Sequence, residues 1–290
     1  DNGVVEEGVS QTGQEVTAAV VSNMTRGRSC SCLMAEKAEA DVFPIDMGIA
    51  CEVEHRGELY PLTERKIRRG TSNFTKAAAM TRQEVLTAIL TGIDAVRVLK
   101  EQGYRLSAVG EMGIGNTTTS SAVASVLLQK DPELVTGAGA GLDSAGLKRK
   151  TEAIRRGIGL HHPDPMDGME VLQKVGGFDL AAMTGAFLGG AIYHVPVVID
   201  GVIAAAAAAA AGRIAPAAKD YMLAAHVSAE PASIWLLDLI GVTPAIQAGL
   251  RLGEGTGALA LFPLLDMALS IYRDMDTFAE MEIEEYKLLV

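Results

Sequence analysis

Val-Gly-Glu-Met-Gly-Ile-Gly-Asn-Thr-Thr, residues 109–118, is the stretch that decides the fold. It follows an apolar run at 106–109 and precedes small residues with helical spacing up to Leu128. Its closely spaced glycines let the backbone turn tightly and approach a ligand. A helix that opens on Asn116 after such a turn is an anion site, because its first N–H groups have no intrahelical partner. Glu111 would repel a phosphate placed too near, so we expect phosphate at one end of the turn and chemistry at the other.

Outward from this turn, apolar runs and helical patterns alternate along the chain. We expect strands at 42–47, 106–109, 194–199 and 221–225. We expect helices at 15–24, 81–103, 116–128, 144–160, 167–176, 179–188, 204–211, 231–239 and 258–277. Residues 1–10 and 52–79 are expected as loops. Such alternation predicts an α/β fold, with a parallel sheet and helices on both of its faces.

Polar side chains stand where the expected strands end, at Asp46, Glu111, Asp200 and Ser228. In open α/β sheets ligands bind outside the carboxyl ends of the strands. The pattern therefore favours a single site at one edge of the sheet. Ser228 and Glu230 also precede a helix and could simply cap it.

Composition restricts the class of protein. The chain has 290 residues, 49% of them hydrophobic, and a net charge of −11, which argues against a nucleic-acid binder. The basic residues at 65–69 form only a short cluster beside acidic ones. The longest apolar run, 195–211, is divided by Asp200 and Gly201, so no membrane span is expected. Three cysteines without a disulfide pattern favour free thiols and a cytoplasmic location.

Several familiar motifs are absent or incomplete. The sequence has no Gly-Lys-Ser/Thr phosphate loop and no Gly-x-Ser-x-Gly elbow. The run Gly-Ala-Gly-Ala-Gly at 137–141 lacks the strand of a dinucleotide fingerprint. His161 and His162 are adjacent, and adjacent side chains on a helix diverge, so we expect no metal site. The chain also begins abruptly at Asp1, and we expect a segment upstream of it.

Two glutamates and one lysine have both a functional and an ordinary reading. Glu111 is a catalytic or binding carboxylate, or only a partner for a helix N-terminus. Glu254 has glycine on both sides, so it is either presented to a pocket or an ordinary loop acid. Lys150 lies in a basic helical segment, where a solvated lysine is the ordinary reading. Position alone does not choose between these readings.

The order of several motifs resembles one enzyme family. The motifs are 110–118 (GEMGIGNTT), 176–183 (GGFDLAAM), 198–201 (VIDG) and 251–257 (RLGEGTG), together with 1–4 (DNGV), 14–17 (QEVT) and 69–71 (RGT). In this order the set resembles the nicotinate-nucleotide–dimethylbenzimidazole phosphoribosyltransferases, over essentially the whole chain.

The resemblance implies a Rossmann-like parallel sheet, a small helical domain and a homodimer. Residues 1–25 and 255–290 would contribute to the helical domain, and residues 26–254 would form the large α/β domain with the active site. Family members carry a further N-terminal segment that normally helps to form the helical domain.

The resemblance also implies a reaction. Phosphoribose would pass from nicotinate mononucleotide to 5,6-dimethylbenzimidazole or a related lower-ligand base, with inversion, giving α-ribazole phosphate and nicotinate for cobalamin biosynthesis. The departing nicotinate needs no general acid, whereas the attacking base must lose one proton, so one general base is required. The family's base corresponds to Glu254, its second acid to Glu111, and a functional lysine to Lys150.

The other family contacts follow by position. Those to the nucleotide correspond to Gly113, Asn116, Thr117, Gly177, Asp200, Gly201 and Ser228. Gln14, Met112 and Leu252 would border the aromatic base. The resemblance implies neither a metal nor a cofactor. The alternative is a non-catalytic homologue that binds a nucleotide or a base and acts with a partner subunit.

Overall fold

The computed structural model describes residues 1–57, 59–284 and 286–287. Its central sheet has three parallel strands in the order β3-β4-β5, with bounds Ser107–Ala108, Val197–Ile199 and Met222–Ala224. A second parallel sheet joins β1, Ile45–Asp46, to β2, Thr63–Glu64. The predicted strands therefore form, and they are parallel, but they are shorter than the apolar runs.

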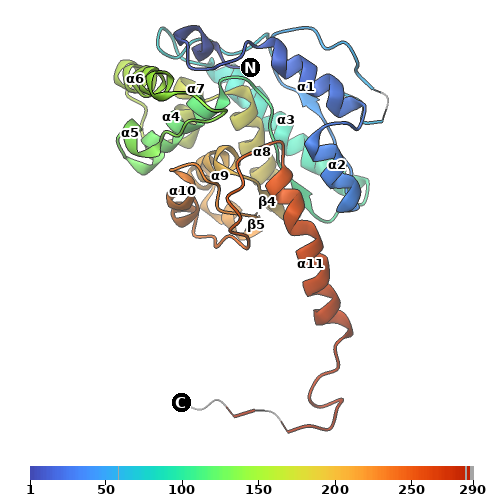
Figure 1. The fold of residues 1–290 in the computed structure, drawn as a ribbon. Helices are drawn as coiled ribbons and strands as arrows, with labels where there is room; N and C mark the ends of the chain where they lie inside the picture. The colour runs from blue at the N-terminus through green and yellow to red at the C-terminus, as the bar shows by residue number, and fades with distance from the viewer. Residues whose placement is uncertain (58, 285, 288–290) are drawn as a thin grey trace.

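Helices make up most of the remaining structure (Figure 1). They are α1 Glu15–Thr25, α2 Cys30–Lys37, α3 Arg82–Glu101, α4 Asn116–Leu128, α5 Pro132–Val135, α6 Ser144–His161, α7 Gly168–Val175, α8 Phe178–Tyr193, α9 Val202–Ile214, α10 Ser233–Ile240 and α11 Thr256–Asp274. Two 3-10 turns, η1 Gly3–Glu7 and η2 Pro216–Tyr221, complete the set. In the described part of the chain, no helix combines the length and apolar character needed to cross a membrane.

Both faces of the central sheet are covered, as predicted. Val197 and Ile199 belong to the main core, where α8 and α9 contact β4. Val198, which points the other way, packs with Ala258 and Leu261 of α11. Side chains alternate between the two faces of a strand, so β4 is buried on both.

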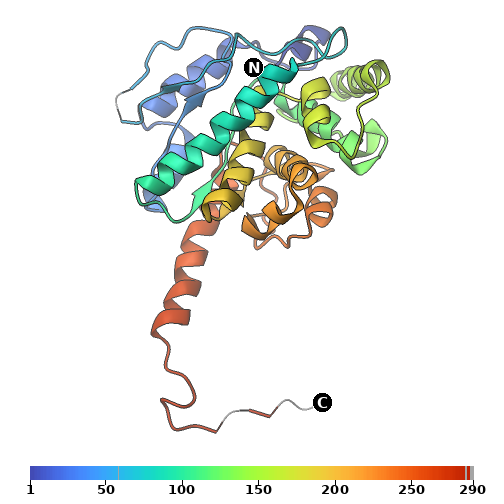
Figure 2. The same cartoon turned by 180° about the vertical axis from the view of Figure 1, so that it is seen from behind.

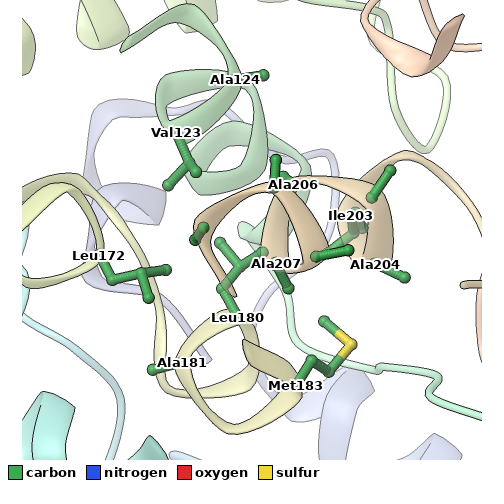
Figure 3. Packing of buried hydrophobic residues seen from close by; sticks show 14 of the residues in the cluster. Val123, Ala124, Leu172, Leu180, Ala181, Met183, Ile203, Ala204, Ala206 and Ala207 are labelled. Atoms are coloured by element: carbon green, nitrogen blue, oxygen red, sulfur yellow. The ribbon is translucent and has the colours of Figure 1, made fainter. Parts of the chain in front are cut away.

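The alanine run of α9 forms the middle of the core. Its eight consecutive alanines, 204–211, are all buried. Figure 3 shows Ala206 and Ala207 of this run among side chains of α4, α7 and α8, including Val123, Leu172 and Leu180. Methyl side chains let helices pack closely from several directions, which explains a helix that is apolar on every side.

Glycines bring α3 and α8 into backbone contact along their length (Figure 2). A Cβ atom at Gly185 would lie 2.0 Å from the carbonyl oxygen of Ile89, and one at Gly189 would lie 3.0 Å from the Cα of Ile93. The predicted end of this helix at Gly189 and Gly190 is therefore wrong. Gly189 and Gly190 instead lie inside α8, which continues to Tyr193, because Gly189 allows close packing against α3 and Gly190 against Val195 and Val197.

Two further expectations needed correction. Helix α2 was not predicted; it is only eight residues long, and its N-cap Ser29 accepts a hydrogen bond from the Cys32 N–H. The segments expected as loops contain η1 and β2. Short elements of this kind depend on tertiary contacts rather than on hydrophobic periodicity.

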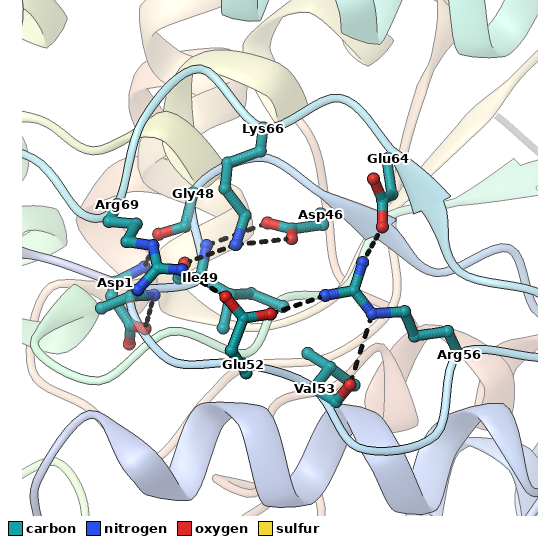
Figure 4. Close-up of polar contacts among 11 residues, drawn as sticks. Asp1, Asp46, Gly48, Ile49, Glu52, Val53, Arg56, Glu64, Lys66 and Arg69 are labelled. Atoms are coloured by element: carbon teal, nitrogen blue, oxygen red, sulfur yellow. Dashed lines mark hydrogen bonds and ion pairs between the residues drawn. The ribbon is translucent and has the colours of Figure 1, made fainter.

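Asp46 does not share a sheet edge with the other polar strand ends, because β1 pairs only with β2 in the described structure. Its carboxylate is buried and accepts the Ile49 N–H at 2.9 Å, with Lys66 Nζ 3.2 Å away (Figure 4). Arg69 of the same basic cluster pairs with Glu52, which also contacts Arg56. Acidic neighbours thus partner these basic residues.

Candidate active site

The glycine-rich loop after β3, residues 109–115, touches the glycine-rich loop before α11, residues 251–255. A Cβ atom at Gly110 would lie 2.4 Å from the backbone nitrogen of Gly255. One at Gly253 would lie 2.7 Å from Glu111 Oε1. Glycine at these positions lets two backbones meet without intervening side chains. Glu111 and the Glu254 loop are therefore brought together from distant parts of the chain.

Glu254 occupies a strained backbone conformation. Its φ is +58°, between Gly253 at +88° and Gly255 at +79°. A left-handed conformation is unfavourable for a residue with a Cβ atom and is typical of functional sites when the surroundings enforce it. The glutamate side chain is half-buried, and Ser31 Oγ lies 3.5 Å from its Oε2 atom.

Asp200 fastens the Glu254 loop to the end of β4. Its buried carboxylate accepts the Gly255 N–H at 3.2 Å and the Ala258 N–H at 3.0 Å. It therefore satisfies free N–H groups at the start of α11. Burial raises the pKa of Asp200, and the backbone N–H groups of Ala258, Gly257 and Gly255, together with nearby His226, oppose that rise. These two hydrogen bonds from Gly255 and Ala258 to Asp200 thus fix the position of the loop.

Glu111 is surrounded by other acidic side chains. Asn116, the first residue of α4, donates its side-chain N–H to Glu111 Oε2. Burial, followed by the negative charges of Asp179 and Asp200, raises the pKa of Glu111 well above its usual range. Asp179 itself has a buried Oδ2 atom with no hydrogen-bond partner among the described residues. Several acids thus crowd one end of the turn.

Lys150 of α6 is fully buried, so the ordinary reading as a solvated lysine is wrong. Its Nζ donates to Thr117 Oγ1 and to the Gly137 carbonyl oxygen, both at 3.0 Å. Burial lowers its pKa to about 8, and Glu230 acts in the opposite direction. A lysine ammonium at the first turn of α4 adds positive charge where the helix dipole already favours an anion.

The start of the chain braces the central turn. The Asp1 carboxylate accepts the Thr17 hydroxyl at 2.6 Å and the Ile114 N–H at 3.2 Å. Gln14 donates to the carbonyl oxygen of Asn2, whose own N–H bonds to Ile114. Sequence reasoning gave Asp1 and Thr17 no role, although both lie in the motifs that carry the resemblance.

Three of the remaining predicted residues are glycines that lie close to other residues of the site, namely Gly113, Gly177 and Gly201. A Cβ at Gly113 would lie 3.3 Å from Asp179 Oδ2, and one at Gly177 would lie 2.5 Å from Asn2 Oδ1. One at Gly201 would lie 3.9 Å from the Ser228 side chain.

Ser228 stabilises its own loop. Its N–H bonds to Ser233 Oγ at 2.9 Å, and its hydroxyl accepts the Glu230 N–H at 3.3 Å. Met112 is half-buried on the first loop, and Leu252 is 61% exposed on the last. Thus the two apolar residues expected to border the base lie on the two loops that meet.

A surface cavity of about 640 Å³ lies elsewhere, lined by residues such as Lys130 and His162.

Comparisons with known proteins place this arrangement in a family. A family model described as phosphoribosyltransferase matches residues 1–283. The chain is similar to the nicotinate-nucleotide–dimethylbenzimidazole phosphoribosyltransferase of Ruminiclostridium cellulolyticum, with 46% identity over 100% of this chain and 81% of that protein. The corresponding enzyme of Clostridium acetobutylicum is 45% identical over the same shares.

A solved structure agrees. The crystal structure of CobT from Thermus thermophilus superposes with a TM-score of 0.92 at 40% identity, covering 99% of this chain and 84% of that one. The family model, the sequence identity and the superposition all lead to the same assignment. The chain belongs to the family of nicotinate-nucleotide–dimethylbenzimidazole phosphoribosyltransferases.

Proposed function

We propose that this chain transfers phosphoribose from nicotinate mononucleotide to 5,6-dimethylbenzimidazole or a related base, with inversion at the anomeric carbon. The products are α-ribazole phosphate and nicotinate. The names of its relatives support this reaction. The structural observation that carries it is the contact between the Glu111 and Glu254 loops, which gathers two carboxylates beside an anion-binding helix N-terminus.

In the proposed reaction, a ring nitrogen of the benzimidazole attacks the anomeric carbon as the bond to nicotinate breaks. The electron pair of that bond returns to the pyridine nitrogen, so the leaving group needs no proton. The other ring nitrogen loses its proton to Glu254, which acts as the general base. Glycines flank Glu254, and no bulky neighbouring side chain in the loop blocks its approach to a substrate.

Glu111 is proposed as a supporting carboxylate. Its raised pKa favours the protonated form in the free protein. Positive charge that develops on the ribose in the transition state would favour the ionised form of Glu111. The ionised carboxylate would then stabilise the transition state more than the ground state.

Lys150 is proposed to serve the phosphate end. Because its Nζ bonds to Thr117 in the first turn of α4, lysine and helix N-terminus would act together on the anion. Gly113 and Asn116 of the same turn would contact the nucleotide.

The decisive experiment measures nicotinate release from nicotinate mononucleotide with a panel of bases, including dimethylbenzimidazole, adenine and phenol. We expect release that depends on the added base, together with formation of the α-linked riboside phosphate. Absence of release with every base would contradict the proposal and favour a non-catalytic binding homologue.

We also propose a homodimer. Helix α11 extends away from the body of the molecule (Figure 1). Apolar side chains along it are exposed, including Met267 at 56% and Ile271 at 60%. Light scattering of the purified protein should give twice the chain mass. We also propose the division into a large domain, residues 26–254, and a helical part formed by residues 1–25 and 255–290. A cytoplasmic location is likewise a proposal.

A further inference from the structure

The Glu254 side chain has a second support, independent of Asp200. Asp200 holds the backbone of the loop through Gly255 and Ala258. It does not contact the Glu254 carboxylate, which could otherwise rotate about its side-chain bonds. The hydrogen bond that the described structure gives this carboxylate comes from Ser31 of α2.

We propose that Ser31 is a positioning residue that orients the Glu254 carboxylate for proton abstraction. This inference rests on the proposed role of Glu254 as the general base. The family motifs contain neither Ser31 nor the rest of α2, so the role extends the site to an element that the reaction alone does not require.

A small hydrogen-bond network at the start of α2 supports the proposal. The Cys32 N–H donates to Ser29 Oγ at 3.2 Å, and the Ser29 and Ser31 hydroxyl oxygens are 2.7 Å apart. Ser31 Oγ then reaches Glu254 Oε2 at 3.5 Å. An ionised carboxylate can only accept hydrogen bonds. Ser31 therefore acts as the donor to Glu254. The Ser29 hydroxyl has two acceptors within reach, Ser31 Oγ at 2.7 Å and Cys32 Sγ at 3.1 Å, and its proton can serve either.

Ser29 and Ser31 are buried, and the packing of α2 holds them in place. Ser29 and Ser31 are 6% and 3% exposed, so neither hydroxyl is free to bond bulk water instead. Ser29 is the N-cap of α2, and α2 packs against α11, the helix that begins just after Glu254. A donor fixed in this way restricts the carboxylate to few orientations, and such preorganisation acts on the rate more than on binding of the nucleotide.

The first test compares Ser31→Ala with a matched control, Ser125→Ala. Ser125 is also a buried helical serine; its hydroxyl donates to the Lys130 carbonyl oxygen, outside the candidate site. We expect Ser31→Ala to lower kcat roughly fivefold while the KM for nicotinate mononucleotide stays within a factor of two. Ser125→Ala should leave both constants unchanged. An unchanged kcat in Ser31→Ala, or a change in KM alone, would overturn the proposal.

A double-mutant cycle separates positioning from a general structural effect. If Ser31 acts through the carboxylate of Glu254, Ser31→Ala should cost nothing further in the Glu254→Gln background. The same fivefold loss in both backgrounds would overturn the proposal. Failure of the proposed function has a different readout: the unaltered protein would then release no nicotinate with any base.

Discussion

Two glycine-rich loops meet in this protein, and each carries a glutamate in a different state. Glu111 follows a strand, receives a hydrogen bond from Asn116, and has a raised pKa because it is buried among other acids. Glu254 precedes a helix, lies half-buried in a left-handed conformation, and is supported by Asp200 through the backbone and by Ser31 through the side chain.

The difference shows how surroundings assign roles to identical side chains. A carboxyl group whose pKa is raised by burial and neighbouring acids is poorly suited to accept a further proton, whereas a glutamate held by a hydrogen-bond donor can act as a base. Motif position alone makes Glu111 equally eligible. The geometry of the two loops favours Glu254 for the proton transfer and Glu111 for a supporting role.

The largest expected effect comes from replacing Glu254, the proposed general base. Glu254→Gln keeps the size of the side chain but cannot accept the proton, so kcat should fall about 10²–10⁴-fold. Nucleotide binding, measured by calorimetry, should be unchanged. Near-normal turnover at saturating benzimidazole would show that Glu254 is not the base.

Separating the two loops should have the next largest effect. At Gly110→Ala the new methyl group would lie 2.4 Å from the Gly255 nitrogen, so the backbone must shift. We expect a loss of about 1–3 kcal/mol in the free energy of unfolding and a fall in kcat of roughly tenfold or more. Chemical denaturation and turnover assays measure the two quantities.

Gly159→Ala is the matched control for this substitution. Gly159 lies in α6, and a Cβ atom there would meet open space. Alanine should stabilise that helix by about 0.5–1 kcal/mol with normal turnover. If Gly110→Ala behaved like the control, contact between the loops would not matter for catalysis.

Lys150 tests the anion end of the first loop. Lys150→Met should raise the KM for nicotinate mononucleotide roughly tenfold, while Lys148→Met, which alters an exposed lysine of the same helix, should not. Because the pKa of Lys150 is lowered to about 8, its positive charge is present below pH 8 and is lost above it. Affinity of the unaltered protein should therefore weaken as the pH rises from 7 to 9. A flat pH profile would argue against a Lys150–phosphate contact.

The smallest effect concerns stability at Glu111. Its pKa is raised in the folded state, so the folded protein binds this proton more tightly than the unfolded chain does. The contribution of Glu111 to the free energy of unfolding is therefore most favourable at low pH and is lost as the pH rises above the ordinary carboxyl range.

Glu111→Gln should remove this dependence. We expect a higher Tm than that of the unaltered protein at pH 8, by about 2–4 °C for each kcal/mol gained, and a smaller difference at pH 5. Thermal unfolding followed by circular dichroism at both pH values measures it. An equal or lower Tm at pH 8 would contradict the inferred pKa shift.

Local patterns in the sequence predicted most of the elements. The helix expected at 81–103 forms as α3, where Thr81 and Glu84 make a capping box, and the alanine run forms α9. Errors arose where one residue type serves two purposes. Gly189 and Gly190 suggested a helix end, but Gly189 instead allows α8 to pack against α3, and Gly190 allows it to pack against Val195 and Val197. Asp46 resembled the other polar strand ends, yet it lies on a separate sheet.

The sequence by itself determined the alternation of strands and helices, the turn after β3, and the family to which the ordered motifs point. These features depend on neighbouring residues, whose spacing fixes backbone conformation and amphipathic faces. Only the tertiary structure decided that Asp200 holds the start of α11, that Ser31 reaches Glu254, and that Lys150 is buried against Thr117. Such contacts join residues far apart in the chain, and hydrogen bonding and burial act between them only after the elements have packed. We therefore propose that the turn at 109–118 sets the position of the site, and that its packing against the loop at 251–255 places Glu254 there.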